Sequence, residues 1–202
     1  QQTDTRRGDD SIVFSPPSYA NFNQLIQPKM INKPEFFKTS EDLKILPIEA
    51  LSALSLQYQE EGKTVVLAHG VFDLVHLGHI RHLEAAKRHG DVLLVTVTAD
   101  KFVNKGPERP VFSENMRAEM LAALEMVDFV AINPAVSLTD ALHEIRPNIY
   151  VKGSDYLNAA DDLTGNIDLE RQVVEKHGGQ VLFTDEITFS SSNIINQHLD
   201  VY

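Results

Sequence analysis

Two histidines near the middle of the chain are spaced so that both can bind a phosphate group. His76 and His79 are separated by Leu-Gly and follow an apolar run that is typical of a buried strand. They stand where a helix is expected to begin, and the unpaired N–H groups and dipole of a helix N-terminus favour an anion. Imidazole nitrogens add hydrogen-bond donors, and Gly70 and Gly78 let the backbone approach a bulky triphosphate. The spacing therefore predicts a phosphate site.

An ordinary structural role is the alternative for this histidine pair. Two nearby histidines are more often surface or packing residues than catalytic ones when spacing is the only signal. A metal site is not predicted, because the HxxH spacing lacks the nearby third ligand of the zinc motif HExxH. The position after a buried strand, together with three further segments of the chain, favours phosphate binding.

The stretch around the histidines resembles the HxGH signature of the cytidylyltransferase-like nucleotidyltransferase superfamily. In that family the two histidines contact the nucleotide phosphates and stabilise the charge that develops at the attacked α-phosphorus. The resemblance therefore implies that His76 and His79 are catalytic. It also implies a nucleotide-binding loop whose residues are Gly70, Val71, Phe72, Asp73 and Gly78.

A loop rich in glycine and proline follows the second expected strand and reads NKGPERPVFS from Asn104 to Ser113. It brings two cations to the end of the sheet where ligands are expected. KGP followed by PVF resembles the loop of choline-phosphate and ethanolamine-phosphate cytidylyltransferases. By that likeness Lys105 is catalytic and neutralises phosphate charge in the transition state, whereas a solvated charged loop is the alternative.

An arginine in the next helix is the fourth catalytic candidate. Ser113 is suited to cap this helix, and Arg117 then lies one turn inside it, at the end nearest the site. In the family an arginine at the matching place binds phosphate. The structural alternative is an ion pair of Arg117 with Glu114 or Glu119.

The third segment follows the fourth expected strand and reads YVKGSDY from Tyr150. It is similar to the VKGGDY sequence of the ADP-heptose synthase nucleotidyltransferase domain and, more loosely, to the matching stretch of glycerol-3-phosphate cytidylyltransferase. The resemblance implies that Lys152, Gly153 and Asp155 bind the nucleotide, with Asp155 and the backbone near Gly153 on the side of its base. For Lys152, an ordinary charge at the end of a strand is the alternative.

The fourth segment, FSSSNII, begins at Phe189 and resembles the STT-N-I-I sequence of the heptose enzyme. The resemblance implies that Phe189, Ser190 and Ser191 meet the triphosphate, while simple capping of the last helix is the alternative. Glycerol-3-phosphate cytidylyltransferases carry an Arg-Thr-Glu-Gly stretch just before this run, where the present chain reads DEIT from Asp185. The arginine that serves the nucleotide there is absent, so the resemblance does not imply CTP.

Alternating strand and helix patterns must position these four segments. Short apolar runs predict five buried strands at 65–67, 92–97, 127–132, 149–151 and 181–183. Helices are expected at about 47–62, 77–89, 114–125, 137–145, 166–177 and 191–199. The alternation predicts an α/β fold, a Rossmann-like doubly wound parallel five-stranded sheet with helices on both faces. Ligands of such sheets bind beyond the carboxyl ends of the strands, where the four segments lie.

Length and composition limit the classes of protein. The 202 residues suit one nucleotidyltransferase domain at 46–202, preceded by an extended or partly disordered arm at 1–45. Asp and Glu outnumber Lys and Arg by 29 to 18, which argues against nucleic acid as a partner. No cysteine is present, so thiolate chemistry is excluded. No apolar run approaches the roughly 20 residues that span a bilayer, so no membrane and a cytoplasmic location are expected.

The predicted reaction is in-line attack by a substrate phosphate oxygen on the α-phosphorus of an NTP (ATP, CTP or GTP), with release of pyrophosphate. The acceptor is expected to be a sugar phosphate or a related phosphorylated small molecule. Mg²⁺ is expected to be bound mainly through the NTP and waters, with Asp73 considered as an indirect partner. The resemblance also implies a homodimer and association with a sugar kinase.

Two other functions stay open at this point. One is a CTP-dependent cytidylyltransferase that acts on glycerol phosphate or an aminoalcohol phosphate. The other is a non-catalytic nucleotide-binding module that keeps the fold without turnover.

Overall fold

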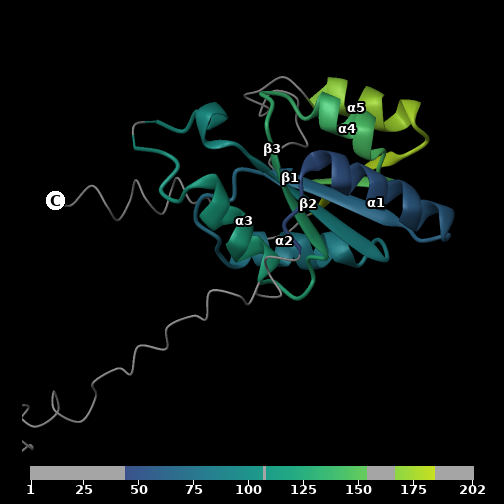
Figure 1. The fold of residues 1–202 in the computed structure, drawn as a ribbon, viewed down its shortest axis with the longest axis horizontal. Coiled ribbons are helices and arrows are strands. Elements are labelled where there is room, and N and C mark those ends of the chain that lie inside the picture. The colour runs from purple at the N-terminus through teal and green to yellow at the C-terminus, as the bar shows by residue number, and fades with distance from the viewer. Residues whose placement is uncertain (1–43, 107, 154–166, 185–202) are drawn as a thin grey trace, which may run out of the picture. The chain divides into compact units, whose positions relative to one another are not determined.

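The computed structural model describes residues 44–106, 108–153 and 167–184, in which helices alternate with strands (Figure 1). The helices are α1 (Ile48–Glu60), α2 (Leu77–Lys87), α3 (Glu114–Ala122), α4 (Thr139–Ile145) and α5 (Ile167–Lys176). The strands are β1 (Val65–Gly70), β2 (Val92–Thr98), β3 (Phe129–Asn133), β4 (Ile149–Gly153) and β5 (Gln180–Thr184). A short 3-10 helix, Asp100–Phe102, follows β2.

The five strands are all parallel and lie in the order β3-β2-β1-β4-β5. Helices α2 and α3 cover one face of the sheet, and α1, α4 and α5 cover the other (Figure 1). Each face has its own apolar core, with Val66 and Leu121 on the first side and Leu67 and Leu142 on the second. The arrangement confirms the predicted Rossmann-like doubly wound α/β class.

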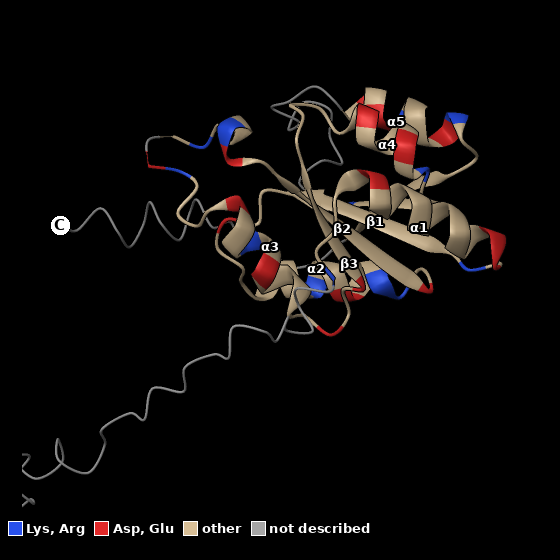
Figure 2. Ribbon diagram, viewed as in Figure 1, with Lys and Arg blue, Asp and Glu red and all other residues tan. Residues whose placement is uncertain are grey.

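The strands are apolar because helices cover both of their faces. The first six residues of β2, for example, are buried without interruption. In Figure 2 most of the ribbon coloured for Lys, Arg, Asp and Glu lies on helices and loops rather than on the strands. Within the five described strands, Lys152 is the one Lys, Arg, Asp or Glu. A charge in that position needs an explanation from its surroundings.

Local signals in the sequence account for the ends of the first three helices. Helix α1 follows Pro47 and stops before Gly62, whose φ of +80° lies in the left-handed region that favours glycine. Helix α3 is capped as predicted, since the Ser113 hydroxyl accepts from the Met116 N–H at 3.4 Å. Helix α2 is capped by His76, a less common cap that matters for the site.

Some element boundaries differ from the predicted ones. Strand β3 begins at Phe129, two residues later than predicted. The Asp128 carboxylate accepts from the Leu93 N–H at 2.7 Å and from the Lys87 ammonium at 2.6 Å, so a side chain rather than a backbone carbonyl is the acceptor for Leu93 there. Helix α3 ends at Ala122 and α4 begins at Thr139, each within three residues of the prediction. The helix predicted at 191–199 lies outside the described residues.

The described part of the chain begins with a short segment that pairs with the edge of the sheet. Ile45 forms a parallel bridge with Val130, and the Lys44 ammonium donates to the carbonyl oxygens of Leu124 and Val127 at 3.3 and 2.8 Å. The chain therefore packs on the sheet from Lys44 onward, two residues before the predicted start of the domain at residue 46. The rest of the predicted arm lies outside the described residues.

Candidate active site

The site lies where the sheet changes winding direction. Strand β1 is central, and the chain leaves it towards α2 on one face, whereas β4, its neighbour, leads to α5 on the other. Such a switch point opens a crevice beyond the carboxyl ends of the two strands. The loop from β1 to α2 and the connection from β2 to α3 both reach this edge and carry the predicted His76 and Lys105, while His79 lies in the first turn of α2.

His76 is fixed by the helix that it caps. Its Nδ1 accepts from the backbone N–H groups of Gly78 at 3.1 Å and His79 at 3.4 Å. In the neutral ring the proton therefore resides on Nε2, which makes that nitrogen a donor. The ring stacks on the His79 ring with centroids 3.9 Å apart and planes 19° apart. Burial and then the nearby Lys105 ammonium lower the pKa of His76.

His79 is held between two rings at the start of α2. Besides the stack with His76, it meets the edge of the Phe72 ring at a centroid distance of 5.2 Å. Burial lowers its pKa to about 4, assisted by the charges of His76, Lys105 and His82 and opposed by the Leu74 backbone. At neutral pH both histidines are uncharged, so they offer hydrogen bonds rather than positive charges.

The loop before His76 is shaped by packing. Phe72 is buried with a φ of +50°, an uncommon value for a residue with a side chain. A Cβ on Gly70 would lie 3.1 Å from the Phe72 ring. The absence of a side chain at Gly70 therefore makes room for the Phe72 ring. That Gly70 also lets a nucleotide approach the backbone stays a prediction. Gly78 is buried in the first turn of α2, and the carbonyl of Val71 accepts from Arg117.

Lys105 lies on an exposed span next to Gly106, whose φ is +104°. Its ammonium is close enough to His76 and His79 to lower the pKa of both. The structure therefore stacks two of the four predicted catalytic side chains on each other and places a third, Lys105, within electrostatic range of them.

The Asp73 side chain links the loop from β1 to α2 with the connection from β2 to α3. Its buried carboxylate accepts from Arg109 Nε at 2.5 Å and from the backbone N–H groups of Val111 at 2.6 Å and Phe112 at 3.3 Å. Both oxygens are thus engaged with the protein. This geometry does not fit the indirect Mg²⁺ contact that was considered from the sequence.

Arg117 is fully buried, and protein acceptors surround its guanidinium group. It donates to four oxygens, which are the carbonyls of Val71, Thr98 and Phe112 and the carboxylate of Asp100. The Asp100 contact is 2.6 Å long. The carboxylate partner is therefore neither Glu114 nor Glu119, and Glu114 accepts instead from the Asp100 N–H at 2.7 Å. These contacts favour a role in joining loops over the predicted contact with phosphate.

Lys152 is buried at the end of β4 and forms an ion pair with Glu170 of α5 at 2.9 Å. The Glu170 carboxylate also accepts from the Tyr150 hydroxyl at 3.0 Å. The lysine is therefore part of a compensated interior pair rather than an ordinary solvated charge at a strand end. Gly153 follows it as the last residue of β4, with open space where a Cβ would be. The predicted Asp155, Phe189, Ser190 and Ser191 lie outside the described residues.

Two further histidines at the carboxyl edge were missed by motif-based reasoning. His69 Nδ1 lies 3.0 Å from the Thr96 hydroxyl, and His82 Nδ1 lies 2.7 Å from the Thr184 hydroxyl. Burial, followed by the charge of Lys152, lowers their pKa values to about 3 and about 4. His69 could have been noticed in the sequence, because it is a polar residue at the end of an apolar strand. The sequence around His82 shows only that this residue belongs to a helix.

A consequence of these low pKa values is that stability should fall in mild acid. The pKa of His82 is lower in the folded chain than in the unfolded one, so its contribution is present above about pH 6.5 and is lost as pH falls towards 4. We expect His82→Asn to reduce the slope of unfolding free energy against pH in this window by on the order of 1 kcal/mol per pH unit. Urea denaturation at several pH values measures this slope. Exposed His89→Asn is the control, and equal slopes for wild type and His82→Asn would contradict the expectation.

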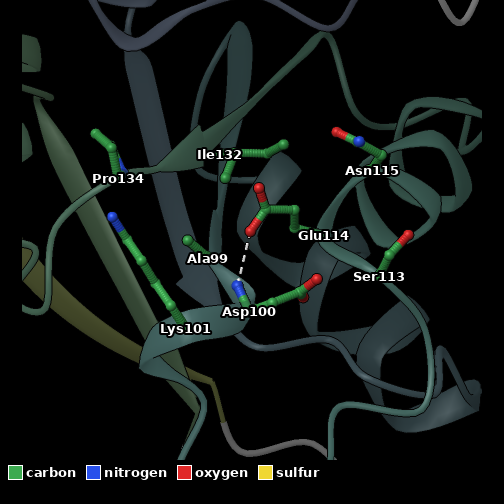
Figure 3. Close-up of a pocket in the computed structure, with 8 residues that line it drawn as sticks. All are labelled: Ala99, Asp100, Lys101, Ser113, Glu114, Asn115, Ile132 and Pro134. Carbon is green, nitrogen blue, oxygen red and sulfur yellow. Dashed lines mark hydrogen bonds between the residues drawn. The ribbon is translucent and has the colours of Figure 1, made fainter.

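A separate pocket of about 430 Å³ opens beyond the carboxyl ends of β2 and β3. It is lined by Ala99, Asp100, Lys101, Ser113, Glu114, Asn115, Ile132 and Pro134 (Figure 3). In this pocket the Glu114 carboxylate accepts a hydrogen bond from the Asp100 N–H, and Lys101 extends towards Pro134. None of the predicted site residues lines this pocket, so it is distinct from the histidine pair.

Neither a metal-binding cluster nor a bilayer-spanning helix occurs in the described part of the chain. No group of three or more His, Cys, Asp or Glu side chains gathers there in a way that would hold a metal ion. Among the described helices, none combines the length and apolar character required to cross a bilayer.

The strand order, with its switch point between β1 and β4, is that of a Rossmann-like domain. The chain belongs to the cytidylyltransferase-like family, whose model matches residues 67–197. It is similar to the bifunctional protein HldE of Syntrophotalea carbinolica, with 37% identity over 164 residues, which make up 80% of this chain and 32% of that protein. HldE of Sulfurimonas denitrificans is 42% identical over 121 residues, or 59% of this chain and 25% of that protein. The chain thus spans about a third or less of these relatives.

Two solved structures share the fold. The lipopolysaccharide core biosynthesis protein of Thermoplasma volcanium aligns with a TM-score of 0.53 and 27% identity, covering 63% of this chain and all of the other. Pantoate-beta-alanine ligase of Francisella tularensis aligns with the same TM-score at 16% identity, covering 75% of this chain and 72% of the other. The second likeness concerns the fold alone.

Proposed function

We propose that this domain transfers a nucleoside monophosphate from an NTP to a sugar phosphate or a related phosphorylated small molecule. The observation that carries the proposal is the stacked pair of imidazoles at the start of α2, whose pKa values are lowered by burial and by the charge of Lys105. Imidazole N–H donors and a lysine ammonium are groups that bind the phosphate oxygens of a triphosphate. Membership in the cytidylyltransferase-like family supports the same reaction type.

In the proposed step, an ionised phosphate oxygen of the acceptor attacks the α-phosphorus of the NTP in line. The new P–O bond forms as the bond from the α-phosphorus to the bridging oxygen breaks, and pyrophosphate leaves with that electron pair. The acceptor is already ionised, so no general base is needed. His76 and His79 donate hydrogen bonds to the phosphoryl oxygens, and Lys105 neutralises part of the negative charge.

The metal and the partners are also proposals. The described residues offer no cluster for Mg²⁺, so we propose that the ion arrives bound to the nucleotide and waters. The curated relatives are named bifunctional and are about three times as long as the matched region, which supports association with a sugar kinase that supplies the acceptor. We also propose a homodimer.

Pyrophosphate release with a panel of NTPs and acceptors tests the proposed function. Turnover with ATP, CTP or GTP and a sugar phosphate is the expected result. Turnover confined to CTP with glycerol phosphate or an aminoalcohol phosphate would replace the sugar phosphate by that acceptor class. Nucleotide binding without turnover across the whole panel would contradict enzymatic transfer and leave a binding module.

A further inference from the structure

The span that carries Lys105 is fastened to the site at both of its ends. On the N-terminal side, Asp100 pairs with Arg117 at 2.6 Å. On the C-terminal side, Arg109 pairs with Asp73 at 2.5 Å. Lys105 lies on the exposed stretch between these two anchors. Holding both ends of a loop reduces the conformational freedom of the chain between them, so the two anchors restrict where Lys105 can lie.

The Asp73–Arg109 anchor ties this span to the segment that carries the histidines. Asp73 stands three residues before His76, and its side chain is 0% exposed, while that of Arg109 is 6% exposed. The same carboxylate also accepts from two backbone N–H groups just after Arg109. A buried ion pair adds little net stability, but removing one partner is strongly unfavourable, so the pair enforces one arrangement of the two loops.

We propose that Arg109 is a positioning residue, which holds Lys105 beside the histidine pair through its ion pair with Asp73. Its kinetic consequence rests on the proposed nucleotidyl transfer. The arrangement itself is a property of this chain and can be measured without turnover.

A direct contact of Arg109 with substrate is the competing interpretation. Arg109 Nη2 is buried and has no hydrogen-bond acceptor within the described part of the chain. A phosphoryl oxygen could take that place after a movement of the loop. The two interpretations differ in one respect: a positioning effect requires Lys105, and a direct contact does not.

A double-mutant cycle of Arg109 and Lys105 distinguishes the positioning role from direct contact with substrate. We expect Arg109→Met and Lys105→Ala each to lower kcat for pyrophosphate release by roughly ten- to a hundredfold, as for loss of a transition-state contact. The double variant should lie within about twofold of Lys105→Ala alone. A kcat that falls by the product of the two single effects would overturn the proposal, since direct contact or general destabilisation acts independently of Lys105.

An NMR titration of His76 tests the same proposal without turnover. Lys105 lowers the pKa of His76, so Lys105→Ala should raise this pKa. Arg109→Met should raise it by the same amount, and the double variant should raise it no further. An unchanged His76 pKa in Arg109→Met would overturn the proposal. Failure of the NTP panel alone would overturn the proposed function and leave this inference standing.

Two more variants guard against artefacts of folding and charge. Asp73→Asn removes the ion pair but keeps a side-chain acceptor for the loop, and it should raise the His76 pKa as Arg109→Met does. Lys101→Met removes a cation from the same connection, on the side of the separate pocket. It should leave the His76 pKa unchanged, and an equal rise in this control would overturn the proposal.

Discussion

Replacement of His79 by alanine should lower kcat for pyrophosphate release by at least about a hundredfold, the scale of losing a preorganised donor to a developing charge. The His79 ring is held by a stack with His76 and an edge contact with Phe72, so its direction is set before substrate binds. Its low pKa keeps it neutral near pH 7, where it acts through a hydrogen bond. Steady-state kinetics with the best NTP and acceptor from the panel measure the loss.

The exposed His89, just beyond the C-terminal end of α2, is a matched control for this variant. His89→Ala should leave kcat within about twofold of wild type, because surface substitutions away from special features have small effects. Urea denaturation of both variants shows whether the fold is retained. Near-normal turnover of His79→Ala would remove this residue from the mechanism.

Replacement of Arg117 by methionine should lower the free energy of unfolding by about 3 kcal/mol, the scale of leaving several buried hydrogen-bond acceptors without their donor. Methionine fills part of the volume but offers no donors. The carbonyls of Val71, Thr98 and Phe112 would then be left in the interior without this partner. Chemical denaturation followed by circular dichroism measures the change.

The neighbouring Met116 provides the comparison. It is 49% exposed on the same helix, and Met116→Ala should change the unfolding free energy by less than about 0.5 kcal/mol. If Arg117→Met unfolds at the wild-type urea concentration and only binds nucleotide less tightly, Arg117 contacts phosphate as the family resemblance implies. The stability measurement therefore decides between a joining role and a binding role.

The histidine site was predictable because its parts are close together in the sequence. A strand, a loop with glycine, a helix start and two histidines all fall within residues 65–79, and local hydrogen bonds of His76 complete the arrangement. The same holds for the alternation of strands and helices, which specified a parallel sheet before any contact was known.

The roles of Asp73 and Arg117 were not predictable in this way. Asp73 meets Arg109 across 36 residues, and Arg117 meets Val71 across 46. The sequence shows that these charges are present but not which acceptors the fold will bring to them. Arg117 was therefore assigned to phosphate by resemblance, whereas the structure surrounds it with protein oxygens.

By itself, the sequence determined the α/β fold class, the helix that begins at the histidine pair and the presence of Lys105 in a loop at the same edge. Those features depend on local propensity and on spacing within one segment, which the chain carries wherever it folds. Only the tertiary structure decided which charges face one another across loops, and so which of them hold the loops of the candidate site in place. Burial and pairing between distant segments determine that division, and neither exists until the sheet is assembled.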